Sequence, residues 1–179
     1  MPLPAGTHQL GPDNATLSVR TKRSGAAAKA GHDLLIHVTA WEATIAAGED
    51  PADTTMELRA DASSLRVIEG TGGMQALGED DLANIRQTID DEVLKRAPIT
   101  FRATSVSAAG DGLRVEGDLT LGGTTAPIAF DLAVADGRLT SRATVKQTAC
   151  KIKPYSALFG ALKVVDEVAV ELDAALPTR

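Results

Sequence analysis

Apolar and polar residues alternate along most of this chain with a period of two, which is typical of β-strands that bury one face. The most regular stretch is GLRVEGDLTLGG, residues 112–123, whose apolar positions are Leu113, Val115, Leu119 and Leu121. Gly117 shares their parity and leaves a gap in the apolar face. A glycine at such a position indicates either a bend in the strand or room for a ligand.

Similar alternation predicts further strands at residues 15–21, 33–47, 54–62, 99–106, 127–135, 139–149 and 165–176. The stretch 33–47 changes parity near Ala40, which predicts one kinked strand or a hairpin. Short turns rich in Gly and Asp separate the strands after residue 99, as in a meander. We therefore expect an all-β fold in which about eight antiparallel strands close into a barrel, because closure removes exposed strand edges.

Two stretches have helical spacing instead. Residues 80–98 place Leu82, Ile85, Ile89 and Val93 on one stripe and stop at Pro98, which predicts an amphipathic helix over about 81–95. SGAAAKAG predicts a short helix near 24–30, with Ser24 as a cap.

The stretch KIKPYSALFGALK, residues 151–163, has apolar residues at the spacing of one helical turn. These residues are Tyr155, Leu158, Phe159 and Leu162. Such a turn would be either a cap packed on the core or a lid over a cavity, and the sequence leaves both interpretations open.

Composition narrows the class of protein. The 179 residues are 44% hydrophobic and 23% charged, which suits a single globular domain over residues 1–179. The net charge of -6 and the lack of a Lys/Arg run argue against a nucleic-acid partner. The N-terminal stretch has neither a basic start nor a long apolar run, so we expect no secretory signal and a cytoplasmic location. Aromatic residues are only 3%, so the interior must be mainly aliphatic.

Few residues suggest reaction chemistry. His32 and His37 are five positions apart, which places them on opposite faces of a strand, and His8 lies in the terminal stretch, so we expect no metal site. His32 with Asp33 is the one pair that resembles an acid/base unit, the alternative being a hydrogen-bonded loop histidine. Cys150 is the lone cysteine and is expected to be a buried thiol.

Three blocks of the chain resemble the YceI-like family of polyisoprenoid-binding, lipocalin-like proteins: residues 89–106, 112–132 and 151–173. Residues 17–38 are similar to the opening strand, helix and second strand of that family. The resemblance implies an eight-stranded antiparallel lipocalin-like barrel. It also implies that the interior holds the apolar tail of a polyisoprenoid, quinone or fatty-acyl amphiphile.

We expect the ligand tail to contact inward-facing residues of the strands and two residues near the mouth, Phe159 and Leu162. The full set is Val19, Ile36, Phe101, Gly117, Leu119, Phe130, Leu132, Val145, Phe159, Leu162 and Val170. Small residues on inward parities favour an open interior, namely Ala103, Ala143, Ala149 and Ala174.

The partner expected from this pattern is one hydrophobic small molecule, such as an isoprenoid or quinone lipid that co-purifies, with no other cofactor, no metal and no catalytic residue. Transient membrane contact and a homodimer through an exposed strand face stay open. Two alternatives also stay open: an enzyme that uses His32 and Asp33 on a small apolar substrate, and a structural or stress-response barrel whose interior is filled.

Overall fold

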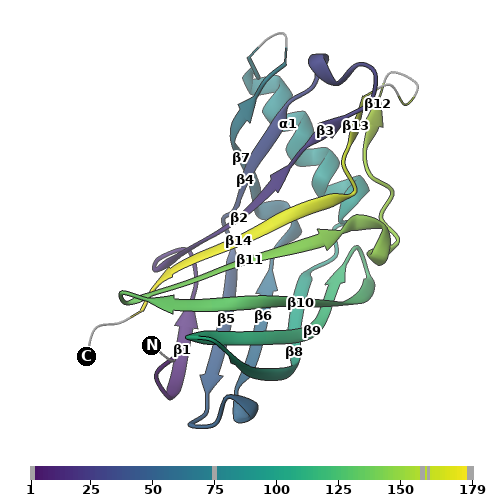
Figure 1. Cartoon of the computed structure of the whole chain (residues 1–179). Coiled ribbons are helices and arrows are strands. Elements are labelled where there is room, and N and C mark those ends of the chain that lie inside the picture. The colour runs from purple at the N-terminus through teal and green to yellow at the C-terminus, as the bar shows by residue number, and fades with distance from the viewer. Residues whose placement is uncertain (1–2, 74–75, 158–159, 161, 177–179) are drawn as a thin grey trace.

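The structure is a computed structural model that describes residues 3–73, 76–157, 160 and 162–176. Its main sheet is antiparallel throughout, in the order β1-β5-β6-β8-β9-β10-β11-β14-β2-β4-β7 (Figure 1). These strands are β1 (Gly6–Leu10), β2 (Ala15–Thr21), β4 (Asp33–Val38), β5 (Trp41–Ala47), β6 (Thr55–Ala60), β7 (Leu65–Thr71), β8 (Ile99–Ala109), β9 (Gly112–Leu121), β10 (Thr124–Ala135), β11 (Arg138–Lys146) and β14 (Glu167–Ala175).

A kinked hairpin connects the two ends of this sheet. β4 continues into β5 through Thr39 and Ala40, and β6 continues into β7 through residues 61–64. In one half of the hairpin, β4 pairs with β2. In the other half, β6 pairs with β8. Backbone hydrogen bonds cross the kink from Thr39 to Ser64 and from Asp61 to Ala40. The predicted bend near Ala40 is therefore confirmed.

The curled sheet confirms the predicted fold class, an antiparallel lipocalin-like barrel. Counting each kinked run once, the strands around it are β2, β4/β5, β6/β7, β8, β9, β10, β11 and β14. The strand count exceeds the predicted one because the kinks divide two runs and because short strands, such as β1, pair at the edges.

One end of the barrel is filled by its own side chains. The alternation predicted for residues 112–121 appears as alternate burial along β9. Val115, Leu139 and Ala174 are completely buried, and Leu139 pairs with both Val134 and Ala174. We call this region the filled end, defined by Val106, Leu113, Val115, Val134, Leu139 and Ala174.

The predicted amphipathic helix is present. α1 spans Glu79–Thr88 and continues as a π-helical turn over Ile89–Val93. The Asp81 carboxylate accepts a hydrogen bond from the Gly78 backbone N–H at 2.9 Å and so caps the first turn. Within the described residues, no helix has the length and apolar composition of a membrane span.

The short helix expected near 24–30 is largely wrong. Arg23–Ser24 form strand β3, and only Ala28–Ala30 make a single 3-10 turn. Ser24 pairs with Lys163 in a separate small sheet of order β12-β13-β3, and this tertiary pairing overrides the local helical preference.

The structure describes only part of the stretch 151–163, in which one helical turn is expected, and in that part Gly160 lies in a 3-10 turn. Those described residues contain the extended strands β12 (Ser156–Ala157) and β13 (Leu162–Val164), which pair antiparallel. Leu158 and Phe159 lie outside the described residues.

Candidate functional site

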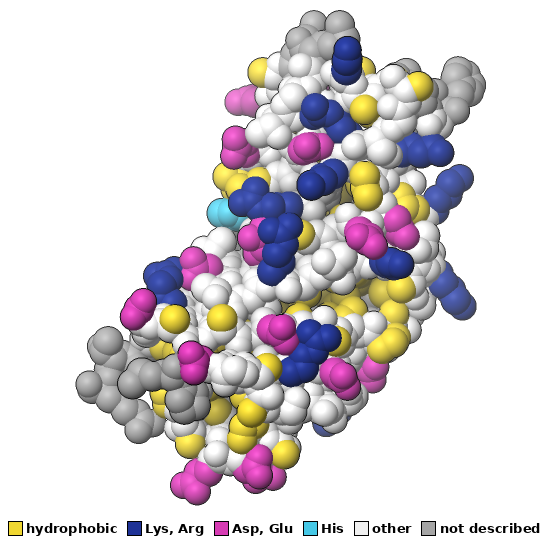
Figure 2. All heavy atoms as spheres, in the orientation of Figure 1, with side chains coloured by type: hydrophobic (Ala, Val, Ile, Leu, Met, Phe, Trp, Pro, Cys, Tyr) yellow, Lys and Arg dark blue, Asp and Glu magenta, His cyan; other side chains and the backbone are white. Residues whose placement is uncertain are grey.

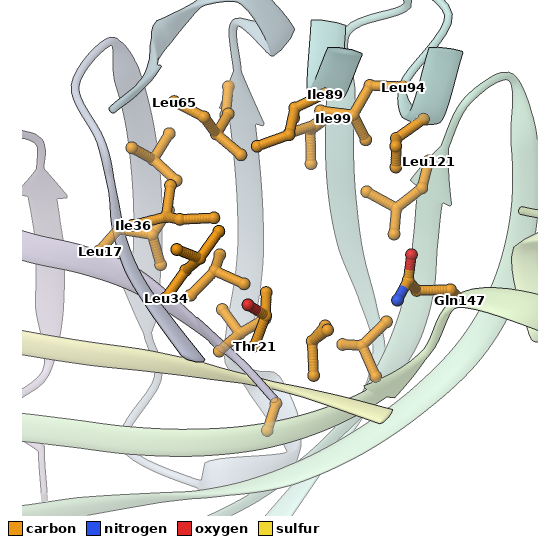
Figure 3. Close-up of a pocket in the computed structure, with 18 of the residues that line it drawn as sticks. Leu17, Thr21, Leu34, Ile36, Leu65, Ile89, Leu94, Ile99, Leu121 and Gln147 are labelled. Atoms are coloured by element: carbon orange, nitrogen blue, oxygen red, sulfur yellow. The ribbon is translucent and has the colours of Figure 1, made fainter. Parts of the chain in front are cut away.

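Beside the filled end, the barrel encloses a cavity of about 640 Å³. Its walls come from β2, β4, β5, β6, β8, β9, β10, β11 and β14, from α1 and from the small sheet. Figure 3 shows aliphatic side chains that converge on this space from opposite walls, among them Ile36, Leu65 and Leu121. The interior is therefore open, in contrast to the side-chain-filled barrel that the structural alternative requires.

Most of the predicted contact residues lie in the cavity wall. They are Val19, Ile36, Phe101, Leu119, Phe130, Leu132, Val145, Leu162 and Val170. Phe159 lies outside the described residues. The strand parity assumed from the sequence therefore places these side chains on the inner face, whereas contact with a ligand stays a prediction.

Gly117 shapes the wall without lining the cavity directly. A Cβ at this position would collide with the carbonyl oxygen of Arg102 and lie 2.6 Å from Cζ of Phe101. β8 and β10 flank β9 and are about 10 Å apart at ordinary strand spacing. The rings of Phe101 on β8 and Phe130 on β10 nevertheless meet, with centroids 5.4 Å apart and planes tilted by 55°. The missing side chain thus lets two rings pack together across the intervening strand.

The small residues predicted to face inward occupy different positions in the structure. Ala143 is buried and lines the cavity, whereas Ala174 belongs to the filled end and Ala103 is half-buried. The prediction for Ala149 is wrong, because this residue is exposed. It lies in the 3-10 turn Gln147–Cys150, where the alternation of the preceding strand has ended.

Polar groups gather at the end of the cavity next to the small sheet. Arg23, Tyr155 and Lys163 line it from the small sheet and its approach, and Asn84 and Thr88 line it from α1. In Figure 3 the Thr21 hydroxyl and the Gln147 amide point into the cavity near this end. We call this end, opposite the filled end, the mouth. The cavity consequently has an apolar interior and a polar opening.

Trp41 provides an isolated hydrogen-bond donor in the wall. It lines the cavity where β5 leaves the kink and is 7% exposed. Its indole Nε1–H finds no acceptor among the described residues. Buried indoles usually have a partner, so this N–H is a polar group that the fold leaves unsatisfied. Trp41 is also the single tryptophan of the chain, which makes it a specific fluorescent reporter of the cavity.

His32 and Asp33 have different environments. His32 lines the cavity, next to Gly73. The Asp33 carboxylate accepts a hydrogen bond from the Arg23 backbone N–H at 2.9 Å, which ties β4 to β3. Through this contact Asp33 stabilises the local structure between the two strands. Among the described residues, no group of three His, Cys, Asp or Glu side chains is placed to hold a metal ion.

Cys150 is a buried free thiol, as expected from its isolation in the sequence. It packs with Ala126 and Ile152 beside the cavity wall. Burial raises the pKa of the thiol, which disfavours the reactive thiolate. Cys150 therefore has the environment of a packing residue.

Sequence reasoning missed the contribution of the helix to the cavity. Ile85, Ile89 and Val93 line it, although they were recognised only as the apolar stripe of an amphipathic helix. The stripe itself was the available signal, since an apolar face must cover something. What it covers depends on the long-range path of the chain, which periodicity does not reveal.

A model of the YceI-like domain matches residues 11–176. The chain belongs to the YceI-like family. The crystal structure of BcnA from Burkholderia cenocepacia is similar to this YceI-like chain, with a TM-score of 0.59 and 16% identity over 91% of this chain and 96% of that one. A mutant YceI protein from Campylobacter jejuni, solved with a monobromobimane guest, has a TM-score of 0.52 and 12% identity over 80% and 85% of the two chains. At these identities the similarity concerns the fold. Among curated proteins the sequence has no match.

Proposed function

We propose that this YceI-like protein binds one amphiphilic lipid and carries or sequesters it, with the apolar tail inside the barrel and the head group at the mouth. The observation that carries this proposal is the 640 Å³ cavity with aliphatic walls and a polar opening. Transfer of apolar surface into such a space is favourable, and the polar opening leaves a head group hydrated.

The volume limits the ligand to one tail of moderate length. Cavities that hold single small molecules measure roughly 300–1,000 Å³, and this cavity lies within that range. A long polyisoprenoid would have to fold back or protrude from the mouth. We therefore expect affinity to rise with tail length until the cavity is full and then to level off.

Binding strength must also permit release. Burying one five-carbon isoprene unit from water contributes on the order of 3–4 kcal/mol, so several units would exceed any observed affinity if the ligand came from water. A lipid that starts in a membrane gains much less, because its tail is already in an apolar phase. Shape and head-group contacts then determine which lipid the protein prefers.

Polyisoprenoid, quinone and fatty-acyl lipids all fit this description, and the resemblance to the YceI-like family favours the first. The cytoplasmic location expected from the sequence stays a prediction, and a homodimer stays open.

The direct test combines extraction with fluorescence. Purified protein is extracted with organic solvent, and the extract is analysed by mass spectrometry for prenyl, quinone and acyl lipids. The delipidated protein is then titrated with a prenyl alcohol, a short-chain quinone and a fatty acid while Trp41 emission is recorded. Saturable binding of at least one class supports the proposal. A clean extract from lipid-rich cells together with no response to any probe contradicts it.

A matched pair of variants locates the binding site. Ala143→Phe places a ring inside the cavity, whereas Thr144→Phe places the same ring on the exposed face of the same strand. We expect Ala143→Phe to weaken binding at least about tenfold, equivalent to about 1.4 kcal/mol, and Thr144→Phe to leave it unchanged. Equal affinities of the two variants would place the ligand outside the barrel.

A further inference from the structure

Two distant segments of this acidic chain contain basic residues and no acidic ones. Residues 22–31 and 151–165 together contain six of the 18 Lys and Arg residues and none of the 24 Asp and Glu residues. The remaining sequence therefore contains 12 basic and 24 acidic residues. The two segments are more than 100 positions apart, so the sequence alone does not show that they are neighbours.

The fold brings the two segments together at the mouth. β3 from the first segment pairs with β13 from the second, and the Val165 N–H donates to the Lys22 carbonyl at 2.8 Å. Leu162 packs closely against Gly31. Both segments also line the opening of the cavity, through Arg23, Ala30 and Gly31 on one side and Tyr155, Leu162 and Lys163 on the other.

The lysines of this region are exposed and form no ion pair with the described residues. We call Lys22, Lys29, Lys151, Lys153 and Lys163 the rim lysines, and all five side chains are exposed. In the part of the chain that the structure describes, none of them forms an ion pair, whereas cations on the barrel wall do, as in Arg114–Asp131 at 3.1 Å and Arg102–Glu57 at 3.6 Å. In Figure 2 Lys and Arg side chains gather over the upper half of the molecule, where β3 and β13 lie.

Nearby carboxylates leave this charge largely uncompensated. Asp33 is engaged by Arg23, with Nη1 3.9 Å from the carboxylate, and Asp166 accepts hydrogen bonds from Thr148. The acidic start of α1 also borders the cavity, through Asp81, but this helix packs against β7. The rim is therefore basic on the side of the small sheet and acidic on the side of the helix.

Tyr155 adds an amphipathic aromatic side chain to the basic side. It is 48% exposed and is one of two large hydrophobic residues that stand out as exposed among the described residues. A tyrosine surrounded by lysines is typical of surfaces that lie at the boundary between lipid and water, where the ring contacts acyl chains and the amines contact phosphates.

We propose that the small-sheet side of the rim docks on an anionic lipid bilayer and turns the cavity mouth towards the lipid. This inference rests on the proposed function, because an amphiphile whose tail leaves a bilayer for the barrel requires the mouth to meet that bilayer. Unpaired lysines near an anionic surface attract it electrostatically, and the attraction weakens as salt is added. The acidic remainder of the protein opposes contact by any other face.

The test measures flotation of the full chain with vesicles of phosphatidylcholine alone or mixed with phosphatidylglycerol. The rim variant carries Lys→Gln at 22, 29, 151 and 153, and it retains Lys163 because that residue lines the cavity. The control variant carries Arg→Gln at 59, 102, 114 and 138, which changes net charge equally on exposed wall positions. Circular dichroism establishes that both variants are folded, and Trp41 fluorescence measures their binding of a prenyl alcohol without vesicles.

We expect the wild type and the control variant to bind only the anionic vesicles, with loss of binding in high salt, and the rim variant to bind them at least about tenfold more weakly. Unchanged prenyl alcohol binding by the rim variant would separate docking from occupation of the cavity. The inference is overturned if the wild type ignores anionic vesicles, if both variants lose binding equally, or if the rim captures polyglutamate in preference to vesicles, which would indicate an acidic protein partner. Failure of the wild type to bind any of the three probes, the prenyl alcohol, the quinone and the fatty acid, would instead count against the proposed function.

Discussion

The filled end and the mouth belong to the same barrel, but the sequence specifies them in different ways. At the filled end, long strands with regular alternation place aliphatic side chains against one another, as Leu139 does with Val134 and Ala174. At the mouth, short strands from distant segments pair around an opening and leave charged side chains exposed. The comparison predicts that stability is concentrated at the filled end, whereas the proposed recognition of a lipid belongs to the mouth.

The largest expected effect tests whether stability is concentrated in this way. Leu139→Ala removes a completely buried side chain at the filled end, and we expect a loss of about 2–5 kcal/mol in the free energy of unfolding. Leu162→Ala at the mouth truncates a half-buried side chain that lines the cavity, so it should cost less than half as much. Urea denaturation followed by circular dichroism measures both values, and equal losses would remove the distinction between the ends.

A smaller effect is expected at the boundary between the two regions. Gly117→Ala introduces a Cβ that collides with the Arg102 carbonyl and the Phe101 ring, so we expect a loss of about 1–3 kcal/mol through overpacking. Gly78→Ala is the control, because a Cβ there meets its nearest neighbour, Asp81, at 3.6 Å. The same denaturation experiment applies. A Gly117→Ala protein as stable as the control would show that the two rings do not depend on the gap.

The smallest effect concerns pH at the mouth. Asp166 accepts hydrogen bonds from the Thr148 hydroxyl at 2.6 Å and backbone N–H at 2.9 Å, and these bonds lower the pKa of its carboxyl. A carboxyl with a lowered folded-state pKa stabilises the fold above its unfolded pKa of about 3.9 and loses this contribution as pH falls through the folded-state value.

The difference in melting temperature between wild type and Asp166→Asn should therefore be largest at pH 7 and should close as the pH falls well below 4. Asp118→Asn, an exposed position on β9, should differ little from wild type at either pH. A difference for Asp166→Asn that persists at low pH would mean that the substitution acts through packing instead of charge.

The sequence predicted the barrel wall well because alternation is a local property that burial enforces residue by residue. The kink near Ala40, the helix from Glu79 and the inner face of β9 all follow from such local patterns. The small sheet did not follow, because Ser24 is a strand residue only through its pairing with Lys163. Long-range pairing of this kind leaves little trace in the periodicity of either segment.

The sequence predicted an open, apolar interior but did not predict every element that forms its wall. Apolar residues of one strand parity identified eight members of its wall and the stretch 151–163 identified Leu162, whereas the share contributed by α1 was missed. The explanation for Gly117 likewise required neighbours in space: the sequence suggested a bend or ligand room, and the ring of Phe101 occupies the gap. Periodicity assigns a face to a residue but does not reveal which side chain from another strand fills the space above it.

The contact between Phe101 and Phe130 has a consequence for how this family can diverge. Because the rings meet only across a residue without a side chain, the three positions cannot change independently. Relatives with a larger residue at the position of Gly117 should have lost one of the rings, and relatives that keep both rings should keep the glycine. We therefore expect the two rings and the glycine, which lie on three different strands, to vary together among relatives.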